Sequence, residues 1–198
     1  MTPTASPSGR PYLLVGAVWL AVALLASLTG QTESLVPPVP QAVLVLLTGM
    51  VVAAFATRPG FRSWIASLDI RLFPAFHLSR FIGIYFLVLH TRGELPYAFA
   101  VPGGWGDILV AASALLLLLL PGGPAARPGL LFAWNLFGLL DILFVAGTAT
   151  RLALGDPASM AALMRFPLSL LPTFLVPLII ASHLMLLWRL RHARAGNE

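Results

Sequence analysis

Six long apolar segments fill most of this chain of 198 residues and constrain its fold more than any other feature. A helix crosses a hydrocarbon core about 30 Å thick with roughly 20 predominantly apolar residues. Most of the segments approach that length, and the fourth reaches it once Trp105 and its neighbours are counted. We therefore predict an all-α integral membrane bundle of six transmembrane helices, over Tyr12–Gly30, Gln41–Thr57, Phe73–His90, Gly106–Leu120, Leu130–Thr150 and Leu168–Trp188. Apolar residues at helical spacing within Thr57–Leu72 predict an additional short amphipathic helix on the membrane surface.

The composition agrees with a membrane protein and excludes several functions. Charged residues make up only 10% of the chain, against about 25% in an average soluble domain. Lysine is absent, which excludes Schiff-base chemistry, and the absence of cysteine excludes disulfides, thiolate metal centres and cysteine nucleophiles. The net charge of +5 comes from arginines near helix ends, so we expect no nucleic-acid partner. No zinc-protease, nucleophile-elbow or nucleotide-binding motif is present, so nothing indicates an enzyme and no catalytic residue is assigned.

The arginines predict the orientation in the membrane. Basic residues in short loops stay on the cytoplasmic side. If all six segments span, Arg92, Arg151 and Arg165 lie on one side and most of the others lie opposite, namely Arg10, Arg58, Arg62, Arg71, Arg127, Arg189, Arg191 and Arg194. We expect a multi-pass protein of a bacterial inner membrane with both termini in the cytoplasm. Its parts are a disordered tail over residues 1–11, the transmembrane domain over 12–190 and a C-terminal tail over 191–198.

Prolines and glycines interrupt two regions near the predicted outer side. The segment Arg92–Trp105 is apolar but contains Pro96, Pro102 and a Gly-Gly pair, so we predict a re-entrant or interface-hugging segment there. In the last span, Pro172 and Pro177 lack the backbone N–H of other residues. They leave the carbonyls of residues 168 and 173 without helical partners and predict a kink.

Five polar residues inside the predicted spans form the main candidate site. Ionisable groups are costly in lipid, so they face the bundle interior and are either paired or functional. At about 1.5 Å per residue, His77, Asn135 and His183 lie at one height, and Arg80 shares a face with His77. By the same rise Asp141 lies about 9 Å further out, within reach of a long arginine side chain. We predict that the five line a substrate or proton pathway.

The same residues allow two other interpretations. His77 and His183 could be the axial ligands of one b-type haem, with Arg80 at a propionate, in an electron-transfer subunit. A metal ion held by the two histidines and a carboxylate is disfavoured because Asp141 lies too far out. Alternatively, every polar group is interhelical glue in a scaffold or assembly subunit without activity of its own.

A second group of polar residues lies at the ends of the connection between the third and fourth predicted spans. We predict an outer vestibule there, formed by His90, Arg92, Glu94, Asp107 and Trp105. The simpler interpretation of Asp107 is an N-cap at the start of the fourth helix.

The function that we predict from these sites is binding or transport of a small solute or of protons through the polar centre. The partners expected are the lipid bilayer and either further copies of the chain or a membrane subunit. No cofactor is expected outside the haem interpretation.

Overall fold

The computed structural model describes residues 9–195, so most of the predicted N-terminal tail (1–11) and the end of the predicted C-terminal tail (191–198) lie outside the described part of the chain. Within it the chain is helical and contains no strand. The α-helices are α1 (Arg10–Leu28), α2 (Val39–Thr57), α3 (Pro59–Ser67), α4 (Leu72–Phe76), α5 (Gly83–Thr91), α6 (Tyr97–Leu119), α7 (Pro128–Gly155) and α8 (Val176–Ala195). Shorter helical turns are η1 (Gln31–Ser34), η2 (His77–Ile82), η3 (Pro124–Ala126), η4 (Pro157–Met164) and the π-helical η5 (Leu171–Leu175).

In the described part of the chain, six spans are long and apolar enough to cross a membrane, which confirms the predicted architecture and indicates a multi-pass membrane protein. Four of them are α1, α2, α6 and α7. The third span, Leu72–Thr91, is built from α4, η2 and α5, and the last, Leu171–His192, from η5 and α8. The predicted short helix after the second span is present as α3, where Tyr12, Phe61 and Trp64 pack their rings together.

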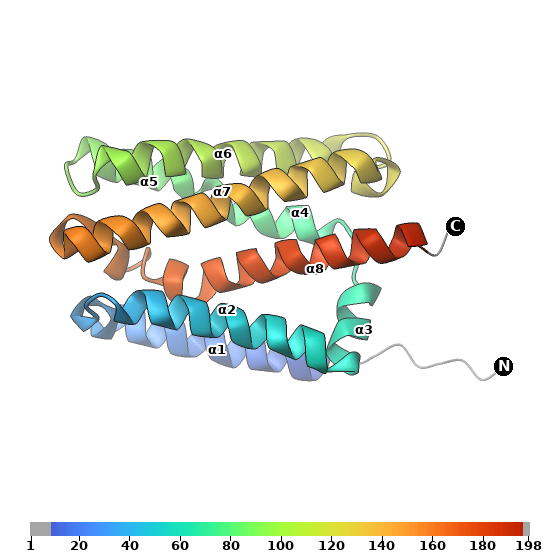
Figure 1. Ribbon diagram of the computed structural model, residues 1–198, viewed down its shortest axis with the longest axis horizontal. Coiled ribbons are helices and arrows are strands. Elements are labelled where there is room, and N and C mark those ends of the chain that lie inside the picture. The colour runs from blue at the N-terminus through green and yellow to red at the C-terminus, as the bar shows by residue number, and fades with distance from the viewer. Residues whose placement is uncertain (1–8, 196–198) are drawn as a thin grey trace.

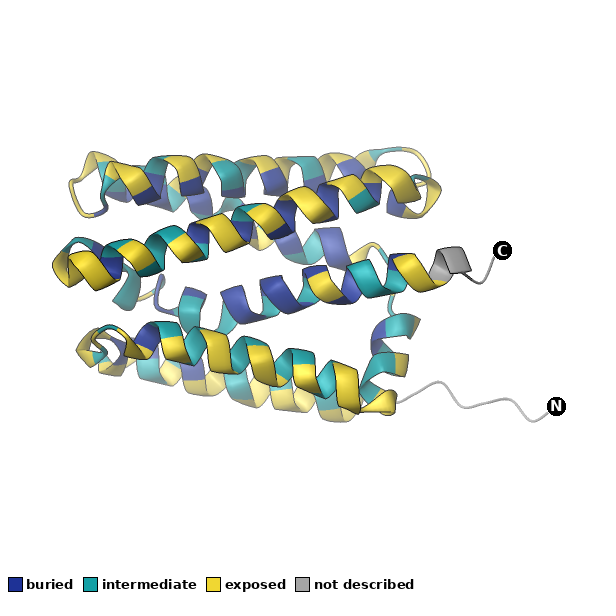
Figure 2. Cartoon of the chain, in the orientation of Figure 1, coloured by how far each residue is buried: buried dark blue, intermediate teal, exposed yellow. Residues whose placement is uncertain are grey.

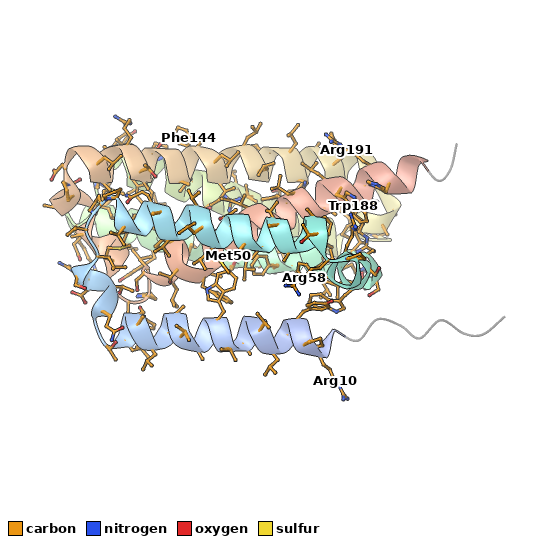
Figure 3. All side chains as sticks on the ribbon, turned by 60° about the horizontal axis from the view of Figure 1, so that its bottom comes forward. Arg10, Met50, Arg58, Phe144, Trp188 and Arg191 are labelled. Atoms are coloured by element: carbon orange, nitrogen blue, oxygen red, sulfur yellow. The ribbon has the colours of Figure 1, made fainter. Side chains whose placement is uncertain are left out.

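The two ends of the bundle differ in charge. The beginning of α1, the helix α3 and the last turns of α8 lie at one end (Figure 1), and Arg10, Arg58 and Arg191 lie there as well (Figure 3). We call this the arginine end. The opposite end, which we call the η4 end, carries η1, η4 and the turn between α5 and α6. Because the number of spans is even, the start of the first span and the end of the last span lie at the same end of the bundle. The assignment of the arginine end to the cytoplasm stays a prediction.

Helix α8 forms the centre of the bundle, and α1 lies at its edge. Figure 2 shows buried residues along α8 and on the inward faces of α6 and α7, whereas α1 and α2 are largely exposed or half-buried. The exposed residues of α1 and α2 are mostly Leu, Val and Met. These apolar surfaces suit contact with lipid, since lipid tails impose no cost on an exposed apolar side chain.

The predicted re-entrant segment at Arg92–Trp105 is wrong, because α6 begins at Tyr97 and runs without a break through Pro102. The glycines that suggested an interruption serve close helix packing instead. A Cβ on Gly104 would lie 2.8 Å from the carbonyl oxygen of Gly83, closer than real Cβ contacts allow. Glycine at both positions therefore lets α5 and α6 touch backbone to backbone, as small residues do in membrane bundles.

The carbonyls freed by the two prolines of the last span are both paired. Leu168 accepts a hydrogen bond from the backbone N–H of Leu171 (2.9 Å). Thr173 accepts one from the indole Nε1 of Trp19 on α1 (2.8 Å). The π-helical turn η5 replaces the predicted simple kink, and the tertiary bond from Trp19 fastens α1 to it.

Candidate functional site

Arg80 lies at the centre of the bundle and ties three elements together. Its side chain, on η2, is 1% exposed. The guanidinium donates from Nε to Oδ1 of Asp107 on α6 (2.6 Å), from Nη1 to the carbonyl of Gly138 on α7 (2.9 Å) and from Nη2 to Oδ2 of Asp141, also on α7. Asp107 lies about 15 Å from the start of α6 by helix rise, which places this ion-pair network near the middle of a core about 30 Å thick.

Glycines make room for the network. A Cβ on Gly106 would overlap the carboxylate of Asp141, and a Cβ on Gly83 would lie 2.8 Å from the Cβ of Asp107. Residues without side chains at these two positions let the carboxylates of α6 and α7 approach the same guanidinium. The Gly-rich stretch of α6 is thus the local reason that both acids reach Arg80.

A pair of buried histidines, His77 and His183, lies near Arg80, and the ring of His183 packs against Gly138 of α7. His183 donates from Nδ1 to Oδ1 of Asn135 (2.8 Å), and Nδ2 of Asn135 donates to the carbonyl of His183 (3.0 Å). The hydroxyl of Ser182 donates its one hydrogen to the carbonyl of Ile179. It can therefore only accept from His77, whose Nε2 donates to it (3.0 Å).

The two imidazole rings are in contact, with centroids 4.1 Å apart. Both are buried, and among the described residues neither Nδ1 of His77 nor Nε2 of His183 has a hydrogen-bond partner. Each of these nitrogens is the acceptor of its ring, because the other nitrogen carries the proton. The structure brings His77, Arg80, Asn135, Asp141 and His183 together in one buried cluster.

The histidine pair does not fit the haem interpretation. Two metal–imidazole bonds of about 2.0–2.1 Å hold the coordinating nitrogens ~4 Å apart on opposite sides of the metal, and each ring centroid lies further out than its nitrogen. The observed centroid separation of 4.1 Å, with planes 37° apart, leaves no space for a porphyrin between the rings. Among residues 9–195 no three His, Asp or Glu side chains come together as metal ligands either.

The structure does not bring the residues of the predicted outer vestibule together. Asp107 is buried in the bundle and does not lie at the outer surface as predicted. Its position follows from the earlier start of α6, whose N-cap is Pro96, so Asp107 lies deep in the helix and is not a cap. His90 pairs through Nδ1 with the carbonyl of Leu95 (3.0 Å). Arg92 and Trp105 are exposed, Trp105 to 55%.

Glu94 lies at the surface of the η4 end, 3.8 Å from Nη1 of Arg165. The two side chains line a shallow depression between the α5–α6 turn and η4. This depression is separate from Arg80, so the structure divides the residues predicted for the vestibule between the bundle centre and the surface.

A cavity of about 500 Å³ leads from the η4 end to the ion-pair network. Its wall includes Arg80 and Asp107 at one end and Glu33 and Arg165 at the other. Between them the lining is mostly aliphatic and aromatic, from α2, α5, α6, α7, η5 and the start of α8, for example Leu44, Phe86, Phe99, Ile142, Val145 and Ile179. On α7, small residues at helical spacing, Ala146, Ala149 and Ala153, form part of the wall.

The pairing of Asn135 with His183 leads to a first prediction. Asn135→Leu removes both interhelical hydrogen bonds, each worth about 0.6 kcal/mol on average in a membrane bundle, so we expect a loss of about 1 kcal/mol of unfolding free energy. The control is Thr48→Val, which removes only a bond to Leu44 within α2 and is expected to cost less. Tryptophan fluorescence during SDS-induced unfolding measures both. Equal stability of the two variants would show that the Asn135 bonds contribute nothing specific.

The chain resembles a known protein family over most of its length. A family model described as a domain of unknown function (DUF8737) matches residues 37–191. The matched range runs from the residues before α2 into the last turns of α8 and therefore includes Arg80, Asp107, Asp141 and most of the cavity wall. No curated protein and no solved structure matches the chain.

Proposed function

As the chain belongs to the DUF8737 family, we propose its function from the cavity itself: it binds a small, largely apolar solute inside the membrane, as a step in moving that solute across. The single observation that carries this proposal is an elongated apolar cavity that ends at a buried ion-pair network. Pockets that hold small molecules have volumes of about 300–1,000 Å³ and apolar walls with a few polar groups that fix orientation. The cavity has this size and this distribution of polar groups.

The position of the opening supports transport over a scaffold role. Exposed residues of the cavity wall, among them Glu33, Pro157 and Arg165, lie at the η4 end, which by the arginine count is the outer side. On the arginine side of Arg80, the buried rings of His77, Trp134 and His183 pack against one another. A solute that enters from outside would therefore stop at Arg80 and Asp107. Passage to the other side needs a second conformation in which this ring layer separates. A scaffold needs neither the cavity nor the layer.

Water access to the cavity gives a second prediction, and the absence of cysteine makes it simple to test. Ala146→Cys places a thiol in the cavity wall, and Phe144→Cys places one on the outer surface of the same helix, where Phe144 is 53% exposed and points away from the bundle (Figure 3). In nanodiscs, a charged methanethiosulfonate reagent should modify residue 146 at least about tenfold faster, because a thiol in lipid does not form the reactive thiolate. Intact-mass spectrometry follows the reaction.

The outcome decides whether the cavity is open to solutes. Slow modification at both positions would mean that the cavity is closed to water and would contradict entry of a solute from the η4 end. A further variant, Ala149→Cys, lies about one turn closer to the opening on the same face of α7 and should react at least as fast as residue 146.

A further inference from the structure

We propose that the solute is an elongated apolar molecule with one ammonium group, and that this group lies against Asp107. The inference rests on the proposed function and names the chemical class that the cavity selects. It follows from the charge of the ion-pair network, from its unused hydrogen-bond acceptors and from the shape of the cavity.

The charges at the inner end of the cavity do not balance. One guanidinium, Arg80, faces two carboxylates, Asp107 and Asp141, so the network carries a formal charge of −1. Among residues 9–195, the only other charged residues of the cavity wall are Glu33 and Arg165 at the η4 end, and they have opposite signs. A net charge buried in a bundle is costly unless a counter-charge reaches it. A positively charged group supplies that counter-charge, and a carboxylate would double the imbalance.

Two oxygen atoms of the cavity wall have no hydrogen-bond donor among the described residues. Nε of Arg80 pairs with Oδ1 of Asp107, and among the described residues no donor reaches the second oxygen of this carboxylate. Oε1 of Gln41, another residue of the cavity wall, is buried and has no partner there. Buried acceptors are normally paired, so a ligand that fits this cavity brings donors. An ammonium group brings up to three donors together with the missing charge.

The shape of the cavity favours a long, narrow molecule. On α7 its wall extends from Ile142 to Ala153, about 16 Å along the helix axis at 1.5 Å per residue. A volume of about 500 Å³ spread over that length gives a channel and not a round chamber. A hydrocarbon chain aligned with the helices fills it, with its polar end at Asp107.

The test compares three probes of equal chain length, namely decylamine, decanol and decanoate. Equilibrium binding of each radiolabelled probe is measured at pH 7 to the full chain in phosphatidylcholine nanodiscs, after subtraction of binding to empty nanodiscs. We expect decylamine to bind about tenfold or more tightly than decanol, the range set by one hydrogen bond to a charged group. Decanoate should bind most weakly. Equal or tighter binding of decanol or decanoate overturns the inference and leaves the proposed binding function standing.

Three variants connect the result to the site. Asp141→Asn leaves the pair of Arg80 with Asp107 and lies outside the cavity wall, so it removes the net charge without touching the ligand. It should abolish the preference for decylamine and keep decanol binding, and a preference that survives overturns the charge argument. Ala149→Trp fills the cavity and should abolish binding of all three probes, whereas Phe144→Trp on the lipid-facing surface should change none. Binding of no probe by the wild-type chain contradicts the proposed function itself.

Discussion

Arg80→Met is expected to cause the largest loss of stability of any single substitution in this chain. It leaves Asp107 and Asp141 buried without a counter-ion, and removal of one partner from a buried ion pair costs about 3–5 kcal/mol. It also leaves the carbonyl of Gly138 without the donor from Nη1. The unfolding free energy in detergent, measured by SDS titration and tryptophan fluorescence, should fall by about that amount. The yield of folded protein should fall with it.

Neutralisation of the two acids supplies the control. In the triple variant Arg80→Met, Asp107→Asn and Asp141→Asn, no charge remains in the network, so most of the lost stability should return. Asp141→Asn alone should be milder than Arg80→Met, since Arg80 keeps its pair with Asp107. If Arg80→Met is as stable as the wild type, or if the triple variant is no better than the single one, the arginine does not hold the bundle together by charge.

The positions of the histidines and of Asp141 follow from simple helix arithmetic. Once the third, fifth and sixth spans are assigned, a fixed rise per residue determines which side chains lie at one height. His77 and His183 meet as predicted, and Arg80 reaches Asp141. The sequence is informative here because apolar length alone sets where a span begins and ends.

The same arithmetic failed for Asp107 because the start of its helix was wrong. Pro102 and the glycines around Trp105 usually interrupt helices, and that propensity excluded the first turns of α6. Tertiary packing overrides it, since the close contact of Gly83 with Gly104 requires small residues in a regular helix. Helix propensity describes an isolated segment, so it contains no information on the residues of another helix that pack against that segment.

The cavity could not be predicted from the sequence at all. Its wall combines residues of η1, α2, η2, α5, α6, α7, η4, η5 and α8, so it exists only when these elements are packed. The bond from Trp19 to Thr173 is a further example, because it joins α1 to a carbonyl whose freedom comes from Pro177. A single sequence shows that the carbonyl lacks a partner within its own helix. It contains no sign of which distant side chain supplies the donor.

Gly138→Ala is expected to destabilise the bundle although alanine is the better helix former. A Cβ at this position would lie 2.6 Å from Cε1 of His183 and 3.2 Å from Cγ1 of Val110. Both neighbours are buried, so the methyl group can be accommodated only if α7 or α8 moves. Overpacking of this kind costs about 1–3 kcal/mol. A shift of α7 would also stretch and weaken the hydrogen bond from Nη1 of Arg80 to the carbonyl of Gly138.

Gly147→Ala on the same helix should act in the opposite direction, and this difference in sign makes the pair a strict test. No atom lies within 4 Å of a Cβ at Gly147, so only the helix propensity changes there, worth about 0.4–1 kcal/mol in favour of alanine. SDS unfolding of the two variants should therefore give shifts of opposite sign. If both substitutions stabilise, His183 is not packed against α7, and the histidine pair, the ring layer beyond Arg80 and the stop for a solute at Asp107 all lose their structural basis. If both destabilise, the exposed surface of α7 is covered by another protein surface and not by lipid.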